Sequence, residues 1–92
     1  MRSPIIELNR AVAVGMAEGP EAGLSIVDRL VHEPALKEYH LLGSVRGDLL
    51  QKLGRHEEAR AAFEAAAALA GNKREQHLLR RRAAEAANAA TS

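Results

Sequence analysis

The sequence predicts an all-α domain of two antiparallel, tetratricopeptide-like helical hairpins followed by a C-terminal capping helix, five helices in all. Apolar residues recur at helical spacing in five segments, short breaks containing glycine or proline separate these segments, and no segment alternates apolar and polar residues as a half-buried strand does. A chain of 92 residues is long enough for one small core. We therefore expect a single domain over residues 3–90.

The first hairpin is expected on either side of a break at Gly19 and Pro20. Ser3 followed by Pro4 predicts the start of the first helix, because a serine side chain can accept a hydrogen bond from a free amide and proline suits the first helical position. Pro34 predicts that the second helix has ended. The expected apolar stripes are Ile5, Leu8, Val12 and Met16, then Ile26, Val27, Leu30 and Val31.

The second hairpin is expected at residues 39–53 and 56–70. Gly54 can take the left-handed backbone conformation that follows a helix, and Gly71 is expected to end the fourth helix. Asn72 followed by Glu75 resembles a capping box, so a fifth helix should start there and fade into the alanine-rich tail at 83–92. The expected apolar positions are Leu42, Val45, Leu49, Leu53, Ala59, Ala62, Phe63, Ala66, Leu69, Leu78 and Leu79.

The two hairpins are predicted to be repeats of one unit. Counting from Gly54, a tetratricopeptide unit of about 34 residues matches five further positions, at which small residues let helices approach closely and Phe63 is the large side chain. They are Gly47, Leu50, Ala59, Phe63 and Ala66. Aligning Ala22 with Ala59 puts Ile26 at the position of Phe63, with an offset of 37 residues. The first unit should therefore be a degenerate terminal repeat.

Composition argues against several classes of function. The 13 Lys and Arg residues and 12 Asp and Glu residues give a net charge of +1, without the excess of positive charge typical of nucleic-acid binders. The chain has no cysteine, which excludes disulfides and thiolate metal sites, and it has no apolar run of about 20 residues. We therefore expect a cytoplasmic protein that does not interact with membranes.

No residue pattern predicts a catalytic centre or a metal site. None of the four histidines has another histidine at the i, i+4 spacing of a helical metal site. Asp48, Glu57 and Glu58 are expected at a helix start or on an exposed face, where a carboxyl group does not acquire the perturbed pKa that acid–base catalysis needs. We expect a protein that is not an enzyme and that needs neither a cofactor nor a metal.

Two sets of residues are candidate interaction surfaces. The inner face formed by the first helix of each hairpin is where tetratricopeptide units often bind peptides, and here it should comprise Glu7, Ser44, Asp48, Gln51 and Lys52, together with Ala11. The basic patch of the fifth helix comprises Lys73, Arg74, Arg80, Arg81 and Arg82. This patch could meet nucleic acid or an acidic protein face. The alternative is a solvated helix surface, since three consecutive helical residues point in three directions.

Several segments also resemble a bacterial protein family. Residues 3–13 (SPIIELNRAVA) and 47–55 (GDLLQKLGR) carry the resemblance, and residues 69–72 and 78–82 extend it. They are similar to the tetratricopeptide-like C-terminal extension of extracytoplasmic-function (ECF) sigma-70 factors of RNA polymerase. The chain departs from the family at Gly47, where alanine is more usual, and at Ala67 and Ala83, where leucine is common. We expect these departures to weaken the core slightly.

The resemblance implies a non-catalytic domain that regulates transcription initiation. In that family the regions that bind core polymerase and promoter DNA lie upstream of the extension, so the chain is expected to be a C-terminal fragment of a longer sigma factor. The implied partners are the upstream sigma-factor regions, core RNA polymerase or a regulatory protein, and DNA would be contacted by the upstream regions. The alternative is a stand-alone tetratricopeptide adaptor for an unrelated protein. A thin core also leaves a weak homodimer open.

Overall fold

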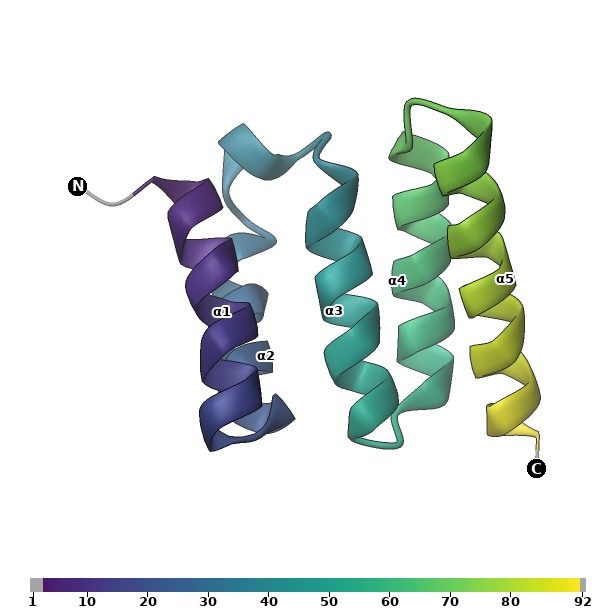
Figure 1. The fold of residues 1–92 in the computed structure, drawn as a ribbon, viewed down its shortest axis with the longest axis horizontal. Helices are drawn as coiled ribbons and strands as arrows, with labels where there is room; N and C mark the ends of the chain where they lie inside the picture. The colour runs from purple at the N-terminus through teal and green to yellow at the C-terminus, as the bar shows by residue number, and fades with distance from the viewer. Residues whose placement is uncertain (1–2, 92) are drawn as a thin grey trace.

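The computed structural model describes residues 3–91, which form an array of helices with no strand in that range (Figure 1). The elements are α1 (Pro4–Glu18), α2 (Pro20–Leu30), the short 3₁₀ helix η1 (Pro34–Leu36), α3 (His40–Lys52), α4 (His56–Leu69) and α5 (Lys73–Ala90). α1 packs against α2, α3 against α4 and α4 against α5, whereas α2 meets α3 less extensively. The all-α prediction, with two hairpins and a last helix, is confirmed.

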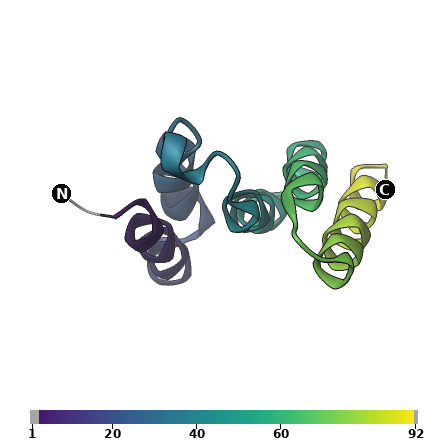
Figure 2. The same ribbon diagram turned by 90° about the horizontal axis from the view of Figure 1, so that it is seen from above.

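The helices are arranged in two rows. Figure 2 shows α1, α3 and α5 on one side of the array and α2 and α4 on the other. The array measures 41 × 30 × 19 Å, and the extensive contacts are between helices that follow one another in the chain. Such an array is stabilised mainly by contacts between neighbours, so the helices at its two ends, α1 and α5, each keep one side uncovered.

Two of the predicted helix-end signals are found as expected. The Asn72 side chain precedes α5 and its Oδ1 accepts a hydrogen bond from the Glu75 amide at 2.8 Å. Gly54 follows α3 with φ of 76°, and the amide of Arg55 donates to the carbonyl of Leu50 at 2.9 Å. The second bond is typical of a Schellman motif, in which a left-handed glycine lets the chain turn back over the helix end. The end of α3 and the start of α5 are thus determined locally.

Two other signals act differently from the prediction. Ser3 has an extended backbone before α1, but its side chain makes no capping hydrogen bond. The helix starts with Pro4, and the Ser3 carbonyl accepts a hydrogen bond from the Glu7 amide at 3.0 Å. Gly71 does not have a positive φ, because the extended backbone of Ala70 already turns the chain out of α4. The predicted capping role of the Ser3 side chain is therefore wrong, whereas α4 ends at Leu69, two residues before Gly71.

The buried side of α1 agrees with the predicted stripe only at Leu8. Leu8 and Ala11 are buried, and a Cβ atom placed on Gly23 of α2 would lie 2.7 Å from the Ala11 carbonyl oxygen and 3.0 Å from the Gly15 Cα. The two backbones touch along this line, which forces the small residues of α1 inward. The other predicted members of the stripe, Ile5, Val12 and Met16, are exposed.

Three further apolar residues that were predicted to be buried are exposed, namely Val31, Leu69 and Leu78. Val31 follows the end of α2, Leu69 is the last residue of α4, and Leu78 lies on the side of α5 away from the body. Alanines take their place in the core: Ala67, Ala70, Ala83 and Ala86 are buried. Because Ala83 and Ala86 pack inward, α5 continues to Ala90, and the predicted fading of the last helix at residue 83 is wrong.

The two hairpins match at a slightly different register from the predicted one. Gly23, Ile26 and Val27 are the buried positions of α2 that repeat the spacing of Ala59, Ala62 and Phe63 in α4. This alignment has an offset of 36 residues and puts Val27, which is fully buried, in the place of Phe63. The first hairpin thus carries a smaller side chain where the second has its aromatic ring.

Candidate functional site

The predicted inner face lies mainly on α3, in the row that also contains α1 and α5 (Figure 2). Lys52 is exposed, whereas Ser44, Asp48 and Gln51 are half-buried. The Gln51 Oε1 atom lies 2.8 Å from Nδ1 of His56, the first residue of α4. Gln51 therefore joins the two helices of the second hairpin.

The two α1 residues of the predicted face are placed differently. Glu7 is half-buried and forms an ion pair with Arg10, with Oε2 3.4 Å from Nη2. Ala11 is fully buried against α2 and cannot be part of a binding face. Including Ala11 in the inner face was therefore wrong, and the reason is the close approach of α2.

A surface pocket of about 230 Å³ lies between α1 and α3. Asp48 and Lys52 are the members of the predicted face that line it, together with Val12, Gly15, Met16, Val45 and Leu49. Met16 is exposed and Leu49 is buried, so the lining combines apolar side chains with the charged Asp48 and Lys52. The α1 side chains that were predicted to be core are thus part of a surface that a partner can reach.

A three-residue cluster joins the two predicted surfaces. Arg82 of α5 donates a hydrogen bond from Nη2 to Oδ1 of Asp48 on α3, and its guanidinium carbon lies 4.6 Å from the centre of the Phe63 ring. The cation over the ring face is a cation–π contact that covers the buried aromatic residue. Arg82 is therefore drawn from the basic patch into a contact that holds α5 against α3 and α4.

The Phe63 ring also lies against Gly47 of α3, and this contact accounts for the glycine at that position. A Cβ atom on Gly47 would lie 2.6 to 2.8 Å from three atoms of the Phe63 ring. An alanine at that position would therefore collide with the ring, and the glycine provides the space that the ring fills. The expectation that Gly47 weakens the core is wrong for this reason.

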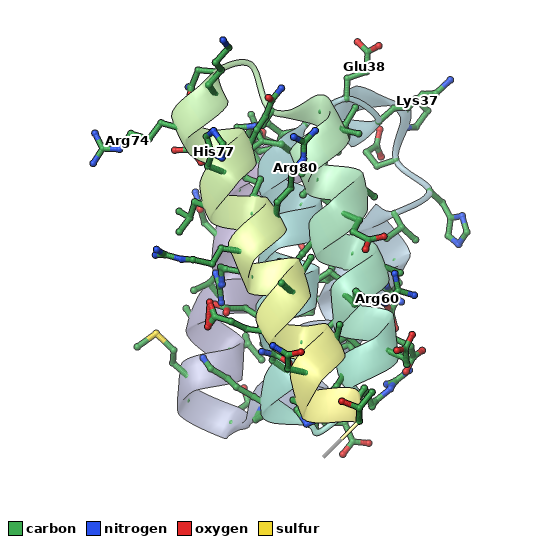
Figure 3. The ribbon with its side chains drawn as sticks, turned by 90° about the vertical axis from the view of Figure 1, so that its right-hand side faces the viewer. Lys37, Glu38, Arg60, Arg74, His77 and Arg80 are labelled. Atoms are coloured by element: carbon green, nitrogen blue, oxygen red, sulfur yellow. The ribbon has the colours of Figure 1, made fainter. Side chains whose placement is uncertain are left out.

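The four remaining basic-patch residues, Lys73, Arg74, Arg80 and Arg81, are exposed on α5. Within residues 3–91 none of them forms an ion pair. Figure 3 shows Arg74, His77 and Arg80 on the upper half of α5, with Arg74 reaching away from the body. Arg74, His77, Leu78, Arg80 and Arg81 line one surface hollow together with Asn72 and Glu75.

Sequence reasoning missed an apolar groove on the opposite side of the array. It has a volume of about 220 Å³ and lies where η1, α3 and α4 meet. Val31 and Leu69, both exposed, are at its edges, and Leu36, Tyr39 and Leu42 are among the residues that line it. The signal in the sequence was the pair Val31 and Leu69, which have the spacing of core residues but lie at helix ends.

The charged residues of α4 form surface ion pairs. Arg55 Nε lies 2.5 Å from Glu58 Oε2, and this hydrogen bond lowers the pKa of the Glu58 carboxyl and raises the pKa of Arg55. Hydrogen bonds to Glu57 and Glu64 likewise raise the pKa of Arg60. These pairs lie on exposed helix surface, where such interactions contribute little to stability.

The histidines and acidic residues are dispersed. Within residues 3–91 no three His, Cys, Asp or Glu side chains come together as ligands for a metal ion. His56 contacts Gln51, and His40 Nε2 lies 3.9 Å from Glu75 Oε2. None of the helices in the described part of the chain has the length and apolar character needed to cross a membrane.

Comparison with known proteins gives one informative match. The chain is 49% identical over 78 residues to an uncharacterized protein of Rhizobium meliloti. The matched segment covers 85% of this chain but 18% of that relative, so the chain spans less than a fifth of the relative's length. No family model matches the chain, and no solved structure matches it.

Proposed function

We propose that this chain is a non-catalytic interaction domain of an ECF sigma factor of RNA polymerase and that it regulates transcription initiation in the bacterial cytoplasm. The observation that carries the proposal is a regular array of helical hairpins that leaves apolar side chains in surface pockets, such as Met16 between α1 and α3. Exposed apolar pockets with charged rims are typical of protein-binding surfaces. The link to sigma factors rests on the resemblance of residues 3–13 and 47–55 to that family.

The match to a longer protein supports the interaction role. In the relative from Rhizobium meliloti the matching segment is part of a much longer polypeptide. A small helical array embedded in such a chain can pack against other segments of the same chain or bring in a separate protein. For a sigma factor these contacts would be with its upstream regions, with core RNA polymerase or with a regulatory protein, while the upstream regions contact promoter DNA.

The second candidate function is a stand-alone tetratricopeptide adaptor for an unrelated protein. The same surface pockets serve this role equally well, because residues of this domain alone line them and no other part of a sigma factor is needed to form them. The coding sequence upstream of residue 1 separates the two candidates. Sigma-type DNA-binding helices encoded there favour the sigma-factor domain, and their absence favours the adaptor.

The test uses the longest protein encoded by the gene, in transcription reactions with core polymerase and its own promoter. Removing residues 3–90 should change the yield of transcript by about fivefold or more, the range of typical regulatory couplings. A milder variant, Met16→Ser with Lys52→Glu, alters the pocket between α1 and α3 without touching a buried residue. It should move the yield in the same direction, and Arg29→Glu on α2 is its control. Unchanged transcription after the deletion would contradict the regulatory role.

A further inference from the structure

The outward side of α5 gathers several exposed cations on one helix, whereas the other exposed cations without an ion pair within residues 3–91, such as Arg29, Lys37 and Lys52, are dispersed over the array. Arg10, Arg46, Arg55, Arg60 and Arg82 each pair with a carboxylate. The exposed cations of α5 have no such partner within residues 3–91. We call this surface the α5 basic face, and it comprises Lys73, Arg74, His77, Arg80 and Arg81.

An apolar residue lies within this face. Leu78 is 44% exposed, and it follows Arg74 by four residues and precedes Arg81 by three, so all three share one side of the helix. It cannot turn inward, because Leu79, Ala83 and Ala86 already occupy the side of α5 that packs on α4. The face therefore offers a leucine flanked by two guanidinium groups.

We infer that the α5 basic face docks an acidic amphipathic helix of a partner protein, with an apolar side chain of that helix against Leu78. Carboxylates of the partner would pair with Arg74 and Arg81, and guanidinium groups suit this role because they bind carboxylates through two parallel hydrogen bonds. The apolar contact at Leu78 would supply affinity, and the neighbouring charges would set orientation and partner choice. This inference rests on the proposed interaction role and adds the surface and the chemistry of the partner.

Nucleic acid is a poorer fit to the same surface. Binding to a phosphate backbone depends on the number of neutralised phosphates, and α5 carries two carboxylates, Glu75 and Glu85, among its five Lys and Arg residues. Arg82 is held by Asp48 and does not reach the outer side. Leu78, which shares one side of α5 with Arg74 and Arg81, has no favourable contact with phosphates. An acidic helix uses both the charges and the leucine, whereas nucleic acid uses the charges alone.

The experiment is a selection for binders of the complete chain from a displayed library of helical peptides of about 18 residues, or five turns. Enriched peptides are then measured by fluorescence anisotropy against four forms of the protein. These are the wild type, Arg74→Glu with Arg81→Glu, Leu78→Ser, and the control Arg29→Glu with Lys37→Glu. The control makes the same change of net charge on two exposed residues, Arg29 of α2 and Lys37 directly after η1. Circular dichroism establishes that all four are folded.

The enriched peptides should be rich in Asp and Glu around one or two apolar residues. Their Kd should rise about tenfold or more for the Arg74 and Arg81 double variant, the loss expected when a charged pair is removed, and also rise for Leu78→Ser. It should change little for the control. The inference is overturned if no peptide is enriched, if enriched peptides are not acidic, or if they bind the double variant as well as the wild type.

Binding of nucleic acid to the α5 basic face is measured in parallel with a fluorescent DNA duplex. Binding of the duplex that is tighter than that of any enriched peptide, at the same salt concentration, would assign the face to nucleic acid and overturn the inference. The outcome is separable from that of the transcription experiment. If deletion of residues 3–90 changes transcription but no acidic peptide is selected, the domain acts through another surface, and the proposed function stands without this partner.

Discussion

Both helical hairpins contain a close approach of small residues, at Gly23 in α1–α2 and at Gly43 in α3–α4, but the second also packs an aromatic ring into the crossing. In α1–α2 the backbones touch, with Gly23 of one helix against Ala11 and Gly15 of the other. In α3–α4 the crossing is filled by the Phe63 ring, which lies against Gly47 and is covered by Arg82 from α5. A close helix crossing can thus be made by small residues alone, as in α1–α2, or by small residues together with one large buried side chain, as in α3–α4. The second solution buries more apolar surface and so should be the more stable half.

The largest effect is expected at the aromatic residue of the second hairpin. Phe63→Ala should lower the free energy of unfolding by about 3 to 5 kcal/mol, because the ring is fully buried and its removal leaves a cavity between three helices. Urea unfolding followed by circular dichroism measures this loss. Val27→Ala at the matching place in the first hairpin should cost less, since fewer buried atoms are removed. A loss below about 1 kcal/mol for Phe63→Ala would show that the ring is not the centre of the core.

The backbone contact of the first hairpin is tested by adding one methyl group. Gly23→Ala should cost about 1 to 3 kcal/mol, because its Cβ would lie 2.7 Å from a backbone oxygen that cannot move aside easily. Gly71→Ala is the matched control, as nothing lies within 4 Å of its Cβ position and its φ is not positive. The control should be neutral or slightly stabilising. Equal stability of the two variants would contradict a touching crossing.

The turns of the two hairpins also differ, with φ of 107° at Gly19 and 76° at Gly54. Substitution of Gly54 tests the turn of the second hairpin. Its φ of 76° is the left-handed conformation, so Gly54→Ala should cost about 1 to 2 kcal/mol through strain alone. No atom lies within 4 Å of the new Cβ, which separates backbone strain from crowding. Gly54→Asn should recover part of the loss, since asparagine tolerates this conformation better. Thermal unfolding of the three forms measures the effect.

Helix capping gives a smaller effect and a clear contrast between the two ends of the array. Asn72→Ala should cost about 0.5 to 2 kcal/mol, because the Glu75 amide loses its hydrogen-bond acceptor. Ser3→Ala should be close to neutral, since the Ser3 side chain makes no such bond. Urea unfolding of the two single variants is sufficient. A cost at Ser3 as large as that at Asn72 would mean that the serine side chain caps α1 in solution.

The smallest effect concerns pH. The pKa of Glu58 is lowered from its ordinary value of 4.5 by the hydrogen bond with Arg55, so folding favours the ionised carboxyl group. The resulting stabilisation is present above pH 4.5 and is lost as the pH falls through the lower pKa of the folded state. The free energy of unfolding of Glu58→Gln should therefore fall slightly less than that of the wild type when the solution is acidified. A pH titration of unfolding in which the variant and the wild type are parallel below pH 4.5 would contradict the pairing.

Prediction from the sequence succeeded where the signal was local. Pro4, the pair Gly19 and Pro20, Gly54 and Asn72 mark helix ends through their own backbone preferences or side-chain hydrogen bonds, and the observed helices begin and end near them. The fold class followed from these ends together with the spacing of apolar residues. Of the candidate site, the exposure of Lys52 and of most of the basic patch was predicted correctly.

Prediction failed where two sets of residues with the same spacing competed for the core. On α1 Leu8 is buried as predicted, but Val12 and Met16 are exposed and the small Ala11 is buried instead. The partner helix decides such cases, because a glycine on α2 can come close to the small residues and not to the large ones. The same limit applied to Leu78 and Leu79. They are adjacent in sequence and both were predicted to be buried, but Leu78 is exposed and Leu79 is buried.

The sequence by itself determined that this chain forms five α-helices separated by short breaks, since proline, glycine and capping residues act within a few positions of themselves. Tertiary structure alone decided which surfaces remain available. It buried the small face of α1, drew Arg82 away from its basic neighbours to Asp48 and Phe63, and left Leu78 among unpaired cations. Those outcomes depend on contacts between helices that are distant in sequence, and the spacing of residues along one helix contains no information on its neighbours.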